Sequence, residues 1–148
     1  MGEVIVRAAV PADYNAIHGL NKTSLGYDYD IIKTKQRMEG LLGNPAHRIF
    51  VAELDGKVYG YIHGTGYEST YADPMVNVLA LAVDGSAQGK GIGKALLLKI
   101  EEWSREKGFF GVRLNSGMER KGAHQFYFAC GYTNKKDHKY FVKLFSAP

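Results

Sequence analysis

The clearest pattern of apolar and polar positions is a pair of β-type runs at residues 49–54 and 57–63. Both runs are rich in β-branched and aromatic residues, and only Asp55 and Gly56 separate them. An Asp-Gly pair tolerates the positive φ angles that a tight hairpin turn needs. The pattern therefore predicts an antiparallel hairpin towards the end of the first half of the chain.

Four other segments carry apolar residues at helical spacing. Residues that favour helix ends bound them: Pro and Asp in a first turn, Asp as an N-cap, and Gly just past a last turn. The predicted helices cover residues 11–21, 31–42 capped by Asp30, 91–107 and 123–130, with a loop at 23–29 between the first two.

The remaining apolar runs are short enough to be strands. The run at 76–83 is nearly continuous, so we expect a strand in the middle of the sheet that is buried on both faces. The other predicted strands cover residues 5–8, 110–115 and 140–144. Strands that alternate with helices in this way indicate an α/β protein.

Composition and length limit the class further. The chain has 148 residues, of which 45% are hydrophobic and 23% charged, so we expect one globular domain over residues 1–148 with one core. No apolar run approaches the ~20 residues of a membrane span, and the start of the chain lacks a signal-peptide layout. We therefore expect a cytoplasmic protein with no membrane contact.

Cysteine and histidine usage argues against disulfides and metal sites. Cys130 is the only cysteine, so an internal disulfide is excluded. The five histidines show no close pairing with Cys130 or with one another at metal-ligand spacing. We expect no metal.

The charge is unevenly distributed along the chain. Residues 1–74 carry 7 basic and 9 acidic side chains, whereas residues 75–148 carry 12 and 6, for a net charge of +4. The second half therefore favours an anion. Its basic residues are interspersed with acidic ones such as Glu101, Glu102 and Glu106, unlike a nucleic-acid-binding tail. A phosphorylated small molecule is the preferred hypothesis, and no nucleic-acid partner is expected.

The segment with the strongest chemical signal joins the run at 76–83 to the helix that follows. Gly89, Gly91 and Gly93 leave backbone N–H groups unshielded where the helix begins, and the first N–H groups of a helix lack an internal partner. The spacing fits neither a Walker loop nor the dinucleotide fingerprint. It favours a pyrophosphate cradle, and a turn that only tightens the junction is the alternative.

At these residues the chain resembles the GNAT superfamily of acetyl-CoA-dependent N-acetyltransferases. The segment 88–93 matches the family's Q/R-x-x-G-x-G/A signature, and 126–132 is similar to its tyrosine-bearing segment. The order of elements matches over nearly the whole chain. The resemblance implies one GNAT-like α+β domain with a mixed, mostly antiparallel, twisted sheet of six to seven strands, about four flanking helices and splayed central strands. It also implies acetyl-CoA as co-substrate.

The resemblance also implies roles for particular residues. Tyr127 corresponds to the family's tyrosine beside the cofactor sulfur, where a phenol can protonate the departing thiolate. Leu79 and Ala80 stand where many members carry a glutamate base, so the base is unassigned. The residues expected to contact acetyl-CoA are Leu81, Ala82, Val83, Gln88, Gly89, Lys90, Gly91, Ile92, Gly93, Lys94 and Arg120.

In this family the acceptor specificity lies in two loops, which here are residues 26–30 and 66–74. Each contains two tyrosines, two acids and no basic residue, a composition that would attract a cationic amine. The alternative is that these are ordinary polar loops with aspartates that cap helices. The candidate substrate-binding residues are Tyr27, Asp28, Tyr67, Glu68, Tyr71 and Asp73.

The sequence therefore predicts an enzyme that acetylates a primary amine by direct attack on the thioester. We expect the acceptor to be a small cationic amine, and a homodimer follows only by analogy with family members. Two alternatives remain: an acyl-CoA-binding regulatory module without turnover, and an acetyltransferase for protein amino groups. A nucleic-acid-binding domain ranks last.

Overall fold

The computed structural model describes residues 2–146 in two compact units, which divide between Leu114 and Asn115. The first unit holds the whole sheet, and the second holds one helix. Met1 and residues 147–148 lie outside the described part of the chain. The single domain over residues 1–148 stays a prediction.

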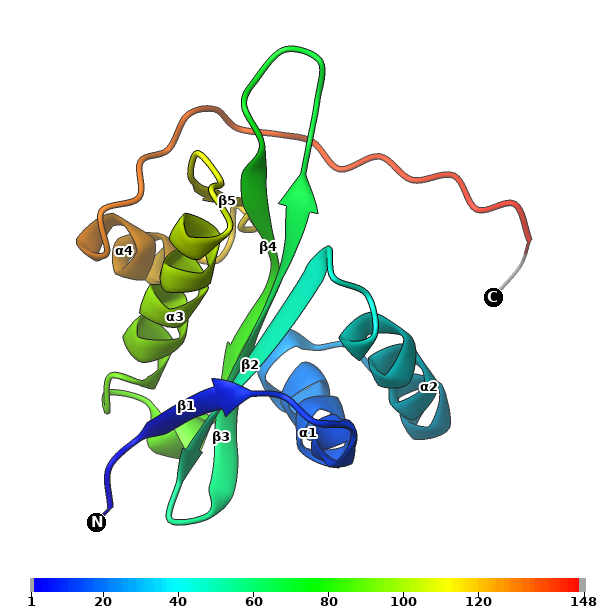
Figure 1. Ribbon diagram of the computed structural model, residues 1–148, viewed down its shortest axis with the longest axis vertical. Coiled ribbons are helices and arrows are strands. Elements are labelled where there is room, and N and C mark those ends of the chain that lie inside the picture. The colour runs from blue at the N-terminus through cyan, green and yellow to red at the C-terminus, as the bar shows by residue number, and fades with distance from the viewer. Residues whose placement is uncertain (1, 147–148) are drawn as a thin grey trace. The chain divides into compact units, whose positions relative to one another are not determined.

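A five-stranded mixed sheet forms the centre of the first unit (Figure 1). Its strands lie side by side in chain order, with three antiparallel pairings followed by one parallel pairing. The predicted mixed, mostly antiparallel α+β class is confirmed, but the predicted six to seven strands are wrong in number. The strands are β1 (Ile5–Ala8), β2 (His47–Leu54), β3 (Lys57–Tyr67), β4 (Met75–Val83) and β5 (Val112–Leu114).

The missing strand is the one predicted at residues 140–144. Within the described residues this segment is extended chain without a ladder partner, and Tyr140 and Phe141 are exposed. Its β-forming composition is real, but a strand exists only where another strand supplies backbone hydrogen bonds. The prediction of a strand there is wrong.

The predicted hairpin is confirmed. Asp55 and Gly56 have φ angles of 53° and 79°, as a two-residue turn with positive φ requires. The two strands are longer than predicted, because their pairing continues from Leu54↔Lys57 out to His47↔Thr65. This extension brings His47 and its neighbours into the sheet.

Four α-helices form, in the predicted order. The N-cap role of Asp30 is confirmed, since its carboxylate accepts a hydrogen bond from the Lys33 N–H at 2.9 Å. The first helix runs past the predicted end at residue 21 and stops only at Gly26, whose φ is +78°, so part of the predicted loop is helical. The helices are α1 (Tyr14–Leu25), α2 (Ile31–Leu42), α3 (Ile92–Glu106) and, in the second unit, α4 (Lys121–Ala129).

Helix α3 covers one face of the sheet at very short range. A Cβ on Gly60 would lie 3.0 Å from Ile92 and 3.1 Å from Leu96, and a Cβ on Gly64 would lie 2.9 Å from Ile100. Only glycine lets the helix approach β3 this closely. The interlocked residues from α3 are fully buried, so this face forms a dry apolar layer.

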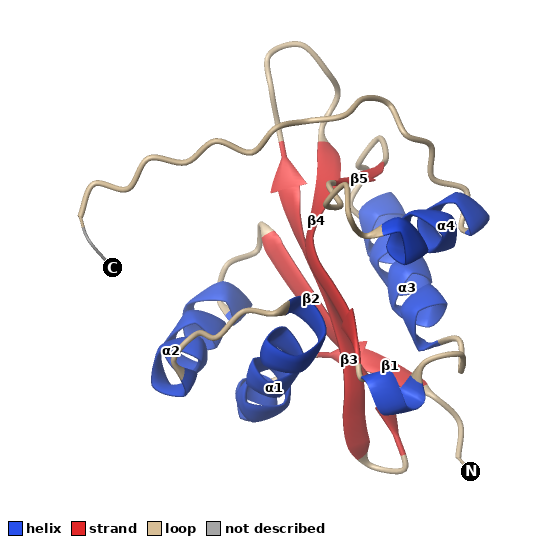
Figure 2. Ribbon diagram, turned by 180° about the vertical axis from the view of Figure 1, so that it is seen from behind, coloured by secondary structure: helices blue, strands red, loops and turns tan. Residues whose placement is uncertain are grey.

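Helices α1 and α2 cover part of the opposite face, as Figure 2 shows from behind. Ile17 and Leu20 of α1 and Met38 of α2 join Val51 and Tyr61 of the sheet in a second buried cluster. This cluster lies under the helices only. The same face continues beyond it as a set of polar side chains, described with the site below.

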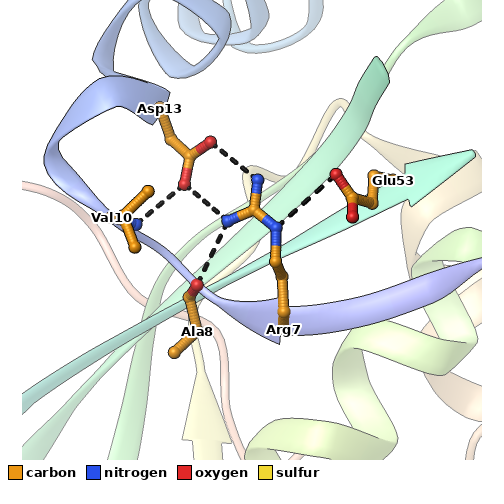
Figure 3. A network of polar contacts seen from close by, with 5 residues as sticks. All are labelled: Arg7, Ala8, Val10, Asp13 and Glu53. Carbon is orange, nitrogen blue, oxygen red and sulfur yellow. Dashed lines mark hydrogen bonds and ion pairs between the residues drawn. The ribbon is translucent and has the colours of Figure 1, made fainter. Parts of the chain in front are cut away.

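The entry into α1 is fixed by an ion-pair network (Figure 3). Asp13 is buried and receives hydrogen bonds from both terminal nitrogens of Arg7, at 2.8 and 3.0 Å, and from the Val10 N–H at 2.8 Å. Burial alone would raise the pKa of Asp13, but these donors outweigh it and lower the pKa. Glu53 adds a weaker contact at 3.5 Å, so the network ties β1 and β2 to the start of the helix.

Candidate active site

Strand β4 extends well beyond its pairing with β5, which ends at Leu114. The parallel pairing covers Val76 to Val78 of β4, and the rest of β4, from Leu79 to Val83, has no partner on that side (Figure 2). All three residues of β5 are paired with β4, so the predicted splay of the central strands stays a prediction. This side of β4 from Leu79 to Val83, which we call the gap, leaves backbone groups of β4 available to a ligand.

The pairing of β4 with β3 decides which backbone groups point into this gap. The Asp84 N–H donates to the Tyr59 carbonyl at 2.7 Å, and bonded pairs alternate along an antiparallel ladder. That alternation directs the groups of Ala82 towards β3, while those of Leu81 and Val83 point away from it. The Val83 carbonyl accepts a hydrogen bond from the Ser24 hydroxyl at 3.0 Å. Cofactor contact by Leu81, Ala82 and Val83 stays a prediction.

A β-bulge interrupts β4 at the inner end of the gap. The register jumps from His63↔Ala80 to Gly64↔Val78, so Leu79 faces no residue of β3. Leu79 is 52% exposed. The expectation that residues 76–83 are buried on both faces is therefore wrong at this position, because the bulge turns one apolar side chain out of the sheet.

Beyond β4, the chain makes the glycine turn that begins α3. Asp84 caps a short 3₁₀ turn by accepting hydrogen bonds from the Ser86 N–H at 2.9 Å and from its hydroxyl at 2.6 Å. Gly89 and Gly91 then adopt φ angles of 80° and 77°. A side chain at either position would strain the backbone, which is why the turn needs glycine.

At this turn, the first backbone N–H groups of α3 have no hydrogen-bond acceptor within the helix. Ala95 is the first residue whose N–H bonds back along the helix, to the Gly91 carbonyl at 3.0 Å. The N–H groups of Ile92, Gly93 and Lys94 precede it and have no acceptor within the helix. Gln88, Lys90 and Lys94 have exposed side chains beside this turn. The arrangement fits a diphosphate, and contact by Gln88–Lys94 remains a prediction.

On the face of the sheet opposite α3, polar side chains lie beyond the area covered by α1 and α2. Strand alternation puts them on one face, and the ladder register places them side by side. We call this set the polar band. Its members are His47, His63, Thr65, Tyr67, Asn77 and Arg113.

Two contacts organise the polar band. The ring nitrogens Nδ1 of His47 and Nε2 of His63 are 2.9 Å apart. At the other end, Arg113 donates a hydrogen bond to the Asn77 side chain at 2.8 Å and stacks over the Tyr67 ring, 4.1 Å from its centroid. Burial, and secondly His47, lowers the pKa of His63 to about 4, so its ring is neutral at pH 7.

The two predicted acceptor loops remain accessible. Tyr27 and Tyr71 are exposed, as are Asp28, Glu68 and Asp73. Tyr67 differs, because Arg113 already occupies one face of its ring. The loop at 66–74 therefore has a basic neighbour from β5 that the sequence of the loop alone did not reveal.

Tyr61 links the sheet to α1, the helix that leads into the first acceptor loop. Its hydroxyl donates a short hydrogen bond to the side chain of Asn21 in α1. Burial, together with the nearby Tyr27, raises the pKa of Tyr61, so the phenol is protonated at neutral pH. Tyr27 therefore lies near a fixed and neutral group.

In the second unit, Tyr127 lies on α4 between two aromatic rings. The ring centroids of Phe126 and Tyr132 are 5.3 and 6.1 Å from that of Tyr127, both in edge-on arrangements. Burial raises the pKa of Tyr127 more than the charge of Arg120 lowers it. The phenol is therefore protonated at neutral pH and able to act as a donor, and its catalytic role stays a prediction.

Arg120 and Cys130 mark the two ends of α4. Arg120 is the N-cap residue, and its N–H donates to the Gly117 carbonyl at 3.0 Å. Cys130 is half-buried with a free thiol. The predicted contact of Arg120 with acetyl-CoA stays a prediction.

Residues 2–146 hold neither a cluster of metal ligands nor a membrane-spanning helix. No three His, Cys, Asp or Glu side chains are grouped so that they could hold a metal ion. Among the helices of this stretch, none combines the length and the apolar character needed to span a bilayer.

Comparison with known proteins agrees with this architecture. The model of the acetyltransferase (GNAT) family matches residues 14–132. Human N-acetylaspartate synthetase is 33% identical over 88 residues, which are 60% of this chain and 28% of that protein. Aminoglycoside N(6')-acetyltransferase type 1 from Stenotrophomonas maltophilia is 27% identical over 141 residues, which are 92% of this chain and 90% of the relative.

A solved structure of aminoglycoside N-acetyltransferase AAC(6')-Iy in complex with CoA has the same fold. The two chains superpose with a TM-score of 0.86 at 18% identity, covering 97% of this chain and 96% of that one. Several curated relatives are much longer, and this chain spans between 28% and 43% of their length.

The mixed sheet, with β4 extending past its β5 partner, and the glycine turn agree with the family match: this chain belongs to the acetyltransferase (GNAT) family. Enzymes of this family are N-acetyltransferases that use acetyl-CoA. The resemblance inferred from residues 88–93 and 126–132 is thereby confirmed.

Two features of the site were missed by sequence reasoning. His47 and His63 are 16 residues apart in sequence and meet only through the β2–β3 register. Arg113 comes from β5, far along the chain from Tyr67. Extending the predicted hairpin strands back to residue 47 would have brought the two histidines into one hairpin. In the register of the structure, both side chains point to the same face of the sheet.

Proposed function

We propose that this protein transfers an acetyl group from acetyl-CoA to a primary amine by direct attack, and that the amine is a small cation. The observation that carries the proposal is the stretch of β4 from Leu79 to Val83, which lies beyond the pairing with β5 and leads straight into the glycine turn and the first N–H groups of α3. One linear ligand with a diphosphate at one end fits both features.

The residues of the chain have separable tasks in this proposal. The N–H groups at the start of α3 and the nearby side chains of Gln88, Lys90 and Lys94 hold the diphosphate. The backbone of Leu81 and Val83 binds the pantetheine arm, and an N–H of this strand stabilises the oxyanion. Acetyl-CoA supplies the activated acetyl group. No nucleophile of the protein is needed, and Cys130 has no part in the reaction.

Proton transfer completes the reaction. The amine nitrogen forms a bond with the thioester carbon, the carbon–sulfur bond breaks, and the phenol of Tyr127 protonates the departing sulfur. The nitrogen releases its extra proton to water as the amide forms, and the phenolate of Tyr127 regains a proton from water. The raised pKa of Tyr127 keeps the phenol in its acid form at neutral pH, which supports this role.

The substrate assignment rests on the two acceptor loops. Asp28, Glu68 and Asp73 are exposed carboxylates near exposed tyrosines, which favours a cationic amine. The relative that covers nearly the whole chain is named for an aminoglycoside, a cationic acceptor. Arg113 beside Tyr67 opposes a cation there, so we place the cation nearer the carboxylates than the Tyr67 ring.

Calorimetry with acetyl-CoA and release of free CoA over a panel of amines test the proposal. We expect acetyl-CoA binding and turnover with at least one small cationic amine. Tyr127→Phe should lower kcat by roughly 10²-fold or more while the Kd for acetyl-CoA changes less than about 2-fold, because the phenol acts on the leaving group. Tyr140→Phe, at an exposed tyrosine, is the matched control.

A second function has one observation in its favour. Leu79 and Ala80 supply no carboxylate at the inner end of the gap, which suits an acyl-CoA-binding module without turnover. Binding of acetyl-CoA with no CoA release across the amine panel would favour that module. Turnover only with a peptide amino group would favour a protein acetyltransferase. If acetyl-CoA does not bind at all, the small-amine acetyltransferase, the binding module and the protein acetyltransferase are all excluded.

A further inference from the structure

We propose that His63 and His47 form a two-residue proton relay that takes the proton from the acceptor ammonium group and passes it to solvent. The inference rests on the proposed acetyl transfer and supplies the base that Leu79 and Ala80 cannot provide. It is carried by the contact between the two rings and by their place in the sheet.

The relay begins at the inner end of the gap in the sheet. His63 pairs directly with Ala80, next to the bulge at Leu79. Directly opposed residues have Cβ atoms roughly 4.5–5.5 Å apart, and Ala80 has no side chain beyond Cβ, so at this position β4 presents only a methyl group to the imidazole. From Val83 to Leu79 the strand spans roughly 13 Å, a length suited to an extended pantetheine arm that starts at the glycine turn.

The two rings are arranged for proton transfer. His47 Nδ1 and His63 Nε2 are 2.9 Å apart, and the ring centroids are 5.1 Å apart with the planes tilted by 45°. Within residues 2–146, the only buried side-chain nitrogen or oxygen without a partner is the Ser116 hydroxyl. The outer nitrogens, Nδ1 of His63 and Nε2 of His47, are therefore within reach of water or an incoming amine.

Among residues 2–146, no carboxylate forms an ion pair with either ring. The helices present apolar Leu25, Leu41 and Leu42 to this face, and β4 presents Ala80 and the neutral Asn77. The titratable or charged groups on the same face are His47 of β2, Tyr61 and Tyr67 of β3, and Arg113 of β5. Tyr61 stays neutral, and Arg113 contacts Asn77 and Tyr67 at the far end of the polar band.

The ring of His63 therefore starts neutral, and the protons of the relay can be followed atom by atom. In the active tautomer, His63 donates its Nε2 proton to His47 Nδ1 and leaves its own Nδ1 free. The ammonium loses a proton to His63 Nδ1, and the free amine attacks. The Nε2 proton of His63 moves to His47 Nδ1, and the Nε2 proton of His47 leaves to water. After the product leaves, His47 Nε2 takes a proton from water, the Nδ1 proton of His47 returns to His63 Nε2, and His63 Nδ1 releases its proton, which restores the starting tautomers. The buried ring is thus relieved of a charge that burial disfavours.

The test is the pH profile of kcat/KM for the amine with saturating acetyl-CoA, in wild type, His63→Gln, His47→Gln and His138→Gln. Glutamine keeps a hydrogen-bonding side chain but accepts no proton near neutral pH. His138 is exposed and makes the matched control. Thermal unfolding and the Kd for acetyl-CoA are measured on every variant, so that a misfolded variant is recognised.

We expect His63→Gln to lower kcat/KM at pH 7 by roughly 10²-fold, with the deficit shrinking as the pH approaches that at which the amine loses its own proton. His47→Gln should give a smaller loss with the same pH trend, and it tests the relay if His63→Gln does not fold. Added imidazole should restore part of the rate to His63→Gln.

Two results would overturn the relay while leaving the proposed function intact. One is an active wild type whose pH profile is unchanged in His63→Gln and His47→Gln. The other is a loss that is the same at every pH. Failure of wild type and His138→Gln alike to release CoA would count against the proposed function itself.

Discussion

The two faces of the sheet are built on opposite principles. On the α3 face, glycines at 60 and 64 let the helix approach so closely that an added Cβ would lie about 3 Å from its side chains, and the layer is apolar and closed. On the other face, α1 and α2 cover only one part, and the polar band with His63 and Arg113 lies beyond their edge.

The α3 face of the sheet therefore supplies packing that stabilises the fold, and the opposite face supplies polar groups that can take part in chemistry. A close-packed layer gains from every apolar contact but leaves no room for a ligand. The polar band retains groups that could be removed without opening a cavity in the main core. The α3 face should therefore respond to changes of volume, and the opposite face to changes of charge and pH.

The largest effect is expected from added volume on the α3 face. Gly64→Val would bring a side chain within 3.0 Å of Ile100 and Val76, and overpacking of this kind should cost roughly 3 kcal/mol of unfolding free energy. Urea denaturation measures the change. Gly40→Val, on an exposed turn of α2 with no atom within 4 Å of the added Cβ, should be nearly neutral. Equal stability of the two variants would contradict the close approach.

A smaller effect is expected from pH on the opposite face. The folded-state pKa of His63, about 4, lies below its unfolded value near 6.5, so the unfolded chain binds more protons between these values. The stability contributed by the neutral ring is present above pH 6.5 and is lost as pH falls towards 4. Allowing for partial exposure, the loss should be roughly 2 kcal/mol.

Urea denaturation from pH 7 to pH 4 measures this loss. The His63→Gln variant is the control, because it lacks the titrating ring while retaining the other groups that titrate in this range. The slope of stability against pH between 6.5 and 4 should be clearly lower in the variant. Parallel curves for the two proteins would show that His63 has an ordinary pKa.

The smallest effect concerns Arg113. Arg113→Met keeps the length of the side chain near Tyr67 but removes its positive charge. If the acceptor is a cation bound near Glu68 and Asp73, its KM should fall by roughly 2- to 5-fold, and the change should shrink at high salt. Arg105→Met, at an exposed position of α3, is the control for net charge. A rise in KM would indicate that the acceptor carries an anionic group.

Local signals in the chain predicted several elements correctly. Asp55 and Gly56 make the hairpin turn, Asp30 caps α2, and Gly91 precedes α3, because each depends on the backbone preferences of one or two residues. The end of α1 was predicted too early, since the helix continues until Gly26 provides a left-handed stop. The final strand was predicted from composition alone and does not form.

The sequence by itself determined the order of elements and the glycine turn at the start of α3, since these follow from local backbone chemistry and from the spacing of apolar residues. Only the tertiary structure decided that Leu79 leaves the ladder, that Val83 and Leu81 face a gap, and that His47 meets His63 and Arg113 meets Tyr67. Such features depend on strand register. Register is set by the packing of residues that are distant in the chain, and no local pattern records it.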